Sequence, residues 1–275
     1  MSLRSYQKVP EHMRLRQVVL LLYLLSICTL LSGCEQHRQP LLVAVAANMH
    51  MPMQAIATSF TEQSGVAVEL IVGSSGKLVA QVEAGAPYDL YLSADARYAN
   101  RLTEANLTES RSVSFAKGHL LLWWREPMQL KSLQDLLKPE VKKIVIANPA
   151  HAPYGRAAIE ALEQQQLLGR LQHKLIYAES ISQVNHLMLQ GAAQVALTGT
   201  AIRRSDHWSK QDKYLLLPDS IHQPICQTVA VVKNSRRKAA AQVFYTYLLS
   251  ARAQDTLQVY GYSIAGTSSC TDSIQ

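Results

Sequence analysis

The chain has 275 residues, of which 27 are Lys or Arg and 20 are Asp or Glu, so its formal net charge is +7 at pH 7. A basic excess can indicate nucleic-acid binding, but part of it lies before residue 17 and the rest is dispersed. Short basic runs beyond that point, such as Arg203-Arg204 and Arg236-Arg237-Lys238, are typical of solvated helix faces. We therefore expect no nucleic-acid partner.

The N-terminal segment combines scattered basic residues with an apolar run from Val18 to Leu31. The run is too short to cross a bilayer of roughly 30 Å as a permanent helix, and it predicts a secretory signal peptide. Its ending, Leu31-Ser32-Gly33-Cys34, resembles bacterial lipoprotein signals. That resemblance implies a signal peptide at 1–33, a lipid on Cys34 and a tether at 34–40, which would anchor the protein to the periplasmic side of a bacterial membrane. The alternative is an ordinary signal peptide with a chance cysteine.

Four cysteines are present, and two of them remain for the folded body. Cys28 lies within the predicted signal peptide and Cys34 at the predicted lipid site. Cys226 and Cys270 would then reach an oxidising compartment, where a disulfide can persist. Either these two residues pair, or one is a small buried hydrophobe and the other an exposed thiol.

From Leu41 onward, strand-like and helix-like segments alternate over about 240 residues, enough for one or two domains with a core. In the first half we expect strands at 41–46, 66–72 and 88–92, and helices at 53–63, 77–83 and 96–104. In the second half we expect strands at 119–124, 143–147, 175–178, 195–197 and 225–232, and helices at 156–168, 181–190, 235–249 and 251–259. This alternation predicts an α/β fold with mainly parallel sheets. The two halves indicate two lobes with a ligand cleft between them.

Four strand-to-helix turns have unusual composition: Ala46-Ala47-Asn48, Gly73-Ser74-Ser75-Gly76, Asn148 to Gly155, and Glu179-Ser180-Ile181. Each leaves unsatisfied backbone donors at the positive end of a helix. Several such ends can hold an anion without a lysine or arginine. Donors without acceptors favour a fully deprotonated dianion, such as molybdate, tungstate or sulfate, over a protonated phosphate. Taken singly, each turn is better explained as an ordinary helix cap.

Together these turns resemble the molybdate-binding proteins of bacterial ABC importers, within the type II periplasmic binding proteins. The most specific part of the resemblance is Glu83-Ala-Gly-Ala-Pro-Tyr-Asp-Leu90, followed by Ser93-Ala-Asp95. The resemblance implies two lobes, the first from 41–120 and 231–275 and the second from 121–230. It also implies a monomeric, non-enzymatic binding component without a cofactor. Such a protein delivers molybdate, and tungstate, to a permease, and molybdenum enters it only within the bound oxyanion.

The family's ligand contacts carry over to five positions, and Ser74 lies beside one of them, Ser75. Tyr154 and Ile181 would contribute mainly backbone N–H groups, and Ala47 could add another. Thr198 stands where the family often has a tyrosine, which leaves a shorter hydroxyl donor. The full set of expected contacts is Asn48, Ser74, Ser75, Tyr154, Ile181 and Thr198.

Other classes of protein remain as alternatives. An exported hydrolase needs a nucleophile beside a base, but the sequence spacing pairs none of His119, His151 and His186 with a serine, and we expect surface or cap roles for them. The turn at Gly73 matches neither a nucleophile elbow nor a P-loop, and no Cys/His group has zinc spacing. Receptors for sulfate, a phosphonate or an Fe(III)-loaded anion remain possible on the same fold. So does a signalling module that acts on a membrane kinase.

Overall fold

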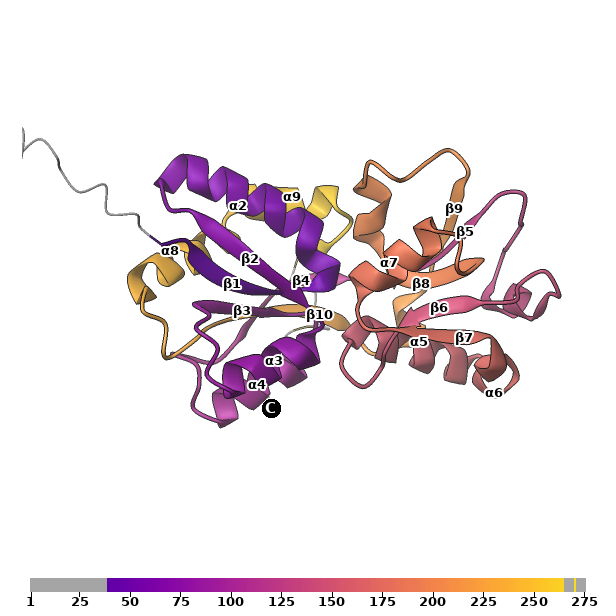
Figure 1. Ribbon diagram of the computed structural model, residues 1–275, viewed down its shortest axis with the longest axis horizontal. Helices are drawn as coiled ribbons and strands as arrows, with labels where there is room; N and C mark the ends of the chain where they lie inside the picture. Colours follow the sequence, from indigo (N-terminus) through magenta and orange to yellow (C-terminus); the bar gives the residue numbers. More distant parts are fainter. Residues whose placement is uncertain (1–38, 265–269, 271–275) are drawn as a thin grey trace, which may run out of the picture. The chain divides into compact units, whose positions relative to one another are not determined.

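Two β-sheets organise the part of the chain that the computed structural model describes, residues 39–264 and 270 (Figure 1). The predicted signal peptide, the predicted lipid site at Cys34 and nearly all of the predicted tether lie outside these residues. Within the described residues, no helix combines the length and the apolar character needed to cross a membrane. Residues 40–275 form a compact unit of their own.

The first sheet has six strands in the order β11-β4-β10-β3-β1-β2. β1 pairs in parallel with β2 and β3, whereas β10 runs antiparallel to β3 and β4. The almost continuous apolar sequence of β1 suits a strand that is covered on both faces. The strands are β1 (Leu41–Ala46), β2 (Val68–Gly73), β3 (Leu90–Ser93), β4 (Val113–Gly118), β10 (Ile225–Val231) and β11 (Ser263–Ile264).

Helices cover both faces of this first sheet, as Figure 1 shows. One face packs against α2 (His50–Ser64), α8 (Lys238–Leu248) and α9 (Ala251–Val259), with Phe60 and Phe244 in edge-to-face contact within that core. The other face packs against α3 (Ser75–Glu83) and α4 (Ala96–Glu104). Successive residues of β1 point alternately into the two cores, which is why both faces of the strand must be apolar.

The second sheet has five strands in the order β7-β6-β8-β5-β9. β6 is parallel to β7 and β8, and β5 is antiparallel to β8 and β9. The strands are β5 (Leu120–Arg125), β6 (Ile144–Ala147), β7 (Leu175–Ala178), β8 (Val195–Gly199) and β9 (Asp212–Leu216). The α-helices are α5 (Pro153–Gln164), α6 (Leu168–Leu171) and α7 (Ile181–Leu189). Short 3-10 turns are η1 (Ala47–Met49), η2 (Leu133–Leu137), η3 (Gln172–Lys174), η4 (Thr200–Arg204) and η5 (Asp219–Ile221).

The two-lobed α/β fold is confirmed. The sheets are mixed and not mainly parallel, because β4, β5 and β10, the strands next to the crossings, run antiparallel to their neighbours. The first crossing follows β4 and agrees with the expected boundary after residue 120. The expected second boundary, after residue 230, is wrong, because β10 pairs with β3 and β4 of the first sheet. All seven residues of β10 are buried, so its apolar sequence carries no sign of which sheet it joins. Strands β4, β9 and β11 were not among the expected elements.

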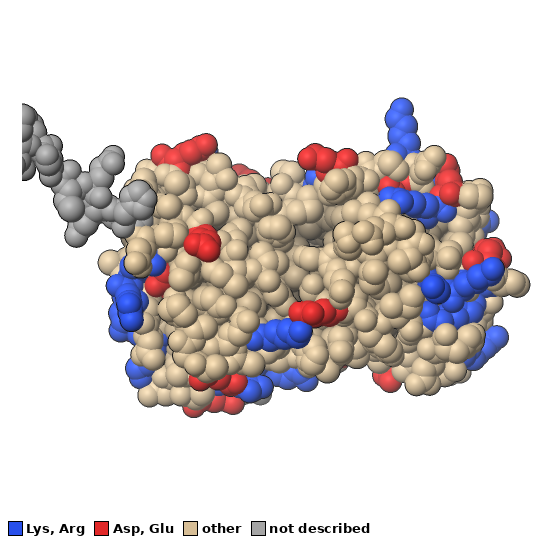
Figure 2. All heavy atoms as spheres, in the orientation of Figure 1, with Lys and Arg blue, Asp and Glu red and all other residues tan. Residues whose placement is uncertain are grey.

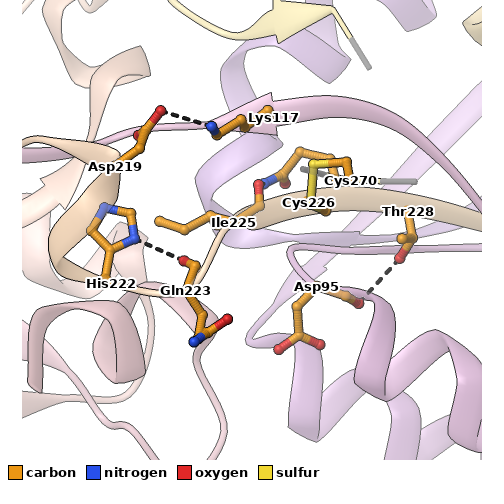
Figure 3. Close-up of a disulfide and its surroundings, with 10 residues drawn as sticks. Asp95, Lys117, Asp219, His222, Gln223, Ile225, Cys226, Thr228 and Cys270 are labelled. Carbon is orange, nitrogen blue, oxygen red and sulfur yellow. Dashed lines mark hydrogen bonds and ion pairs between the residues drawn. A yellow bond between two sulfur atoms is a disulfide. The ribbon is translucent and has the colours of Figure 1, made fainter. Parts of the chain in front are cut away.

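Cys226 and Cys270 form a disulfide, which decides between the two alternatives left open by the sequence. Cys226 lies at the beginning of β10, and the bond joins it to a residue 44 positions further along the chain. Figure 3 shows this disulfide near the second crossing, where the Lys117 ammonium group pairs with Asp219. The cross-link therefore attaches the C-terminal segment to the region where the chain passes between lobes.

Candidate functional site

Five of the six predicted contact residues line one small cavity between the lobes, with a volume of about 10 Å³. Four turns, spread from residue 46 to residue 181, meet there. Every lining residue is uncharged. The complete lining is Ala46, Ala47, Asn48, Ser74, Ser75, Ala152, Pro153, Tyr154 and Ile181.

The cavity lies where three α-helices begin. Ser75 is the first residue of α3, Tyr154 the second of α5 and Ile181 the first of α7. Backbone N–H groups in a first helical turn have no acceptor inside their own helix, and the helix dipole gives that end a partial positive charge. At α7, the Ser180 hydroxyl accepts from the Gln183 N–H at 3.4 Å, which leaves the earlier N–H of Ile181 available. The site therefore gathers backbone donors without any charged side chain.

Two serine hydroxyls add donors to the same cavity. Ser75 Oγ accepts a hydrogen bond from the Ala94 N–H at 3.1 Å, so its own proton remains for a ligand. Ser74 Oγ is buried, and no partner for it exists among the residues that the structure describes. Burying an unsatisfied hydroxyl costs about 1–3 kcal/mol. A bound anion that accepts a hydrogen bond from the Ser74 hydroxyl would offset this cost.

Tyr154 reaches deep into the region between the lobes. Its hydroxyl is buried and has no hydrogen-bond partner within residues 39–264 and 270. Burial, together with the neighbouring Tyr262, raises the pKa of Tyr154 well above its ordinary value. The ring lies so close to Gly118 and Gly199 that a side chain at Gly118 would collide with its hydroxyl. Tyr154 therefore stays neutral and can act as a donor.

Asn48 lines the cavity, but its side-chain amide is engaged elsewhere. The amide Nδ2 donates to Gln227 Oε1 at 2.8 Å and to the Tyr262 hydroxyl at 3.0 Å. Tyr262 in turn donates to the Asn48 carbonyl at 2.8 Å, and Gln227 Nε2 donates to the Ile225 carbonyl at 3.0 Å, which fixes the direction of both amides. The side chain of Asn48 therefore holds the turn in place.

Gln227 and Tyr262 are functional candidates that the sequence did not reveal. They are 179 and 214 residues away from Asn48 along the chain. Neither lies in a turn with a recognisable composition. Only the pairing of β10 within the first sheet and the return of the C-terminal segment bring them beneath the cavity.

Thr198 does not line the cavity. It is fully buried on β8, and its hydroxyl donates to Asn185 Oδ1 at 2.7 Å. A short side chain at this position supports α7 and does not reach the other five residues. The ligand-contact roles of Asn48, Ser74, Ser75, Tyr154 and Ile181 remain predictions.

Direct contacts join the two lobes around the cavity. The Gly76 N–H donates to the His151 carbonyl at 2.9 Å, and the Tyr98 hydroxyl donates to the Ala150 carbonyl at 3.0 Å. Lys77 pairs with Glu179 at 2.7 Å, so the nearest lysine charge is compensated. A further ion pair joins Arg156 to Asp95. Figure 2 shows charged side chains mostly around the edges of this face, with uncharged surface over much of its middle.

His119 has partners that the sequence spacing did not reveal. Its Nε2 lies 2.7 Å from Ser263 Oγ, and its Nδ1 lies 3.1 Å from Asp219 Oδ1. This group joins the two crossing segments and β11, and none of its members lines the cavity described above. In the described residues, no group of three or more His, Cys, Asp or Glu side chains is placed to hold a metal ion.

The fold and the cavity together define a two-lobed α/β protein with a small uncharged cavity between its lobes. The chain belongs to the bacterial extracellular solute-binding proteins, since the model of that family matches residues 41–263.

Several named proteins are similar to this chain over most of its length. It is 31% identical over 223 residues to the molybdate-binding protein ModA of Rhodobacter capsulatus, covering 80% of this chain and 87% of that protein. The solved structure of the Azotobacter vinelandii periplasmic molybdate-binding protein is similar with a TM-score of 0.77 and 28% identity, covering 82% of this chain and 99% of that one. A putative ABC transporter substrate-binding lipoprotein of Bacillus subtilis is 22% identical over 254 residues, covering 87% of this chain and 95% of that protein.

Proposed function

We propose that this protein captures molybdate outside the cytoplasm and presents it to the membrane permease of an ABC importer. One observation carries the proposal: a small cavity lined only by uncharged residues lies at the beginnings of three α-helices. Such helix ends bind anions through backbone N–H groups. The similarity to proteins named for molybdate binding supports the choice of ion.

The donors favour a dianion that carries no proton. A protonated phosphate would need an acceptor aimed at its hydroxyl group, and no carboxylate lines the cavity. Sulfate is smaller than molybdate and would leave donors unsatisfied, each at a cost of about 1–3 kcal/mol. Tungstate has nearly the size and charge of molybdate. We therefore infer that this site binds tungstate and molybdate with similar strength.

The lipid anchor is the second part of the proposal. The sequence Leu31-Ser32-Gly33-Cys34 ends the apolar N-terminal run, and one relative is named as a lipoprotein. We propose that Cys34 carries a lipid that holds the protein on the periplasmic side of a bacterial membrane. Replacement of Cys34 by Ala should release the protein into the soluble fraction. Continued membrane attachment of that variant would contradict the anchor.

Calorimetric titration of the chain beginning at Glu35 tests the ligand, because residues 40–275 form their own compact unit. We expect tight binding of molybdate and tungstate. Sulfate and phosphate should bind at least about a hundredfold more weakly, a difference of roughly 2.7 kcal/mol. Equal affinity for sulfate would refute the assignment.

Ser75→Ala and Thr198→Val form a matched pair that tests the position of the site. Ser75 lines the cavity, and its hydroxyl proton is available for a ligand, whereas the Thr198 hydroxyl is bonded to Asn185. Ser75→Ala should weaken molybdate binding by roughly 10-fold, the loss of one hydrogen bond to a charged group. Thr198→Val should change the affinity much less. The reverse order of effects would place the ligand elsewhere.

A further inference from the structure

A second hollow lies beside the oxyanion cavity and shares three of its residues, Ala47, Asn48 and Ile181. We call this hollow the vestibule; its volume is about 250 Å³. It lies between the start of α2, one face of α7 and the η4 segment. Figure 1 shows α2 and α7 on neighbouring parts of the two lobes. Its remaining lining residues are His50, Met51, Ser182, Asn185, His186, Leu189, Gly199, Ala201, Ile202, Ser205 and His207.

The vestibule differs from the cavity because it contains groups that can become charged. His50, His186 and His207 come from α2, from α7 and from the segment after η4. Among the described residues, no Asp, Glu, Lys or Arg lines the vestibule. Ser205 also lines the vestibule, and its Oγ is buried and has no hydrogen-bond partner in the described part of the chain.

Charged groups on the neighbouring elements are mostly directed to other partners. The Arg203 guanidinium lies over the ring of Tyr214 at 4.0 Å, and Arg204 Nε donates to the Val259 carbonyl at 2.8 Å. Glu179, before α7, is paired with Lys77. Asp206 is an exposed neighbour of His207 and does not line the vestibule. The three histidines are therefore the groups through which pH can change the charge of the vestibule wall.

Histidine is the side chain that ordinarily gains a proton between pH 8 and 5. A concave surface lined by one sign of charge concentrates counter-ions more strongly than a flat surface does. Burial lowers the pKa of His50, so this residue becomes charged at a lower pH than an ordinary histidine. The cavity itself cannot respond to pH in this way, because its lining is uncharged.

We propose that the vestibule is an outer binding site for small inorganic oxyanions, where the imidazole groups of His50, His186 and His207 attract the dianion on its way to the cavity. Because histidine gains a proton as the pH falls, this proposal predicts that the protein binds the oxyanion more tightly in mildly acidic solution. This inference rests on the proposed function, since it requires a dianionic ligand. It assigns the attraction of the ion to the vestibule and the hydrogen bonding to the neutral cavity.

The test measures the dissociation constant of molybdate at pH 8.5 and pH 6.0 in low salt, using the full chain. We expect it to fall roughly 3- to 10-fold from pH 8.5 to pH 6.0. In 0.5 M sodium chloride the change should shrink below about twofold, because exposed charges are screened over a few ångströms at high ionic strength. A variant with His50→Gln, His186→Gln and His207→Gln should show less than about a twofold change between the two pH values, even in low salt.

His173→Gln is the matched control, since His173 lies on η3 and lines neither the vestibule nor the cavity. It should keep the wild-type dependence on pH. Absence of molybdate binding at both pH values would overturn the proposed function. If the affinity does not change with pH, or if the triple variant keeps the pH dependence, the proposed role of the vestibule is refuted and the proposed function is not affected.

Discussion

Replacing Gly76 by Ala should prevent complete closure of the lobes. A Cβ atom at Gly76 would lie 2.9 Å from His151 Cα and 2.9 Å from the Tyr98 hydroxyl. The contact with His151 involves backbone, which cannot move as a flexible side chain would. Relief requires the turn at 148–155 to shift away from α3, and this shift stretches the hydrogen bond from Gly76 N–H to the His151 carbonyl. The same turn leads into Tyr154 at the cavity.

The expected cost follows from the contacts that would be lost. The backbone hydrogen bond contributes about 1 kcal/mol, and a weakened hydrogen bond to the bound anion removes part of a further 1.5–3 kcal/mol. The dissociation constant of molybdate should therefore rise roughly 10- to 100-fold, equivalent to about 1.4–2.8 kcal/mol. Isothermal titration calorimetry measures this change directly.

Gly169→Ala provides the matched control for this prediction. Gly169 lies on α6, where an added Cβ would meet nothing within 4 Å. Its affinity should equal that of the wild type. Thermal unfolding without ligand should be nearly the same for both variants, because partly opened lobes relieve the contact at residue 76. Wild-type affinity in Gly76→Ala would refute the argument that closure brings α3 against the 148–155 turn.

Three further variants test other parts of the structure. Replacing Cys226 and Cys270 by Ser should lower the free energy of unfolding in urea by about 4 kcal/mol, the chain-entropy value for a loop of this length; an unchanged midpoint would contradict it. Asn48→Ala removes the donor to the buried Gln227 Oε1, whereas the Tyr262 hydroxyl still donates to the backbone carbonyl of residue 48; it should lower both molybdate affinity and stability, the latter by about 1–3 kcal/mol. Burial raises the pKa of Asp212, but hydrogen bonds, first that of Arg125, outweigh burial and hold it below 3.8. A lowered carboxyl pKa stabilises the fold above the unfolded-state value and loses this effect as the pH falls through the folded-state value. Asp212→Asn should therefore reduce stability near neutral pH, and the difference from wild type should shrink as the pH falls through the lowered pKa of Asp212; a difference that stays constant during acidification would oppose this reasoning.

The local sequence determined much of the fold and the position of the candidate site. Continuous apolar runs such as 41–46 and 144–147 need burial on both faces, so they identify strands of an α/β protein. Small and hydroxyl-bearing residues after such strands mark helix beginnings with free N–H groups. Because parallel strands end at the same edge of a sheet, the turns at Tyr154 and Ile181, which follow the paired strands β6 and β7, could be expected to converge. Ser75 follows β2 of the first sheet, and the packing of the two lobes brings it to the same cavity.

The tertiary structure decided what depends on partners distant in the chain. An apolar strand does not encode which sheet it joins, so β10 was expected in the wrong lobe. The amide of Asn48 is committed to Gln227 and Tyr262, and only the folded chain brings these residues together. The pairing of Cys226 with Cys270 also depended on distance in space. Thr198 occupies an expected position along the chain, yet it faces Asn185, because the direction of a side chain is set by the packing around its strand.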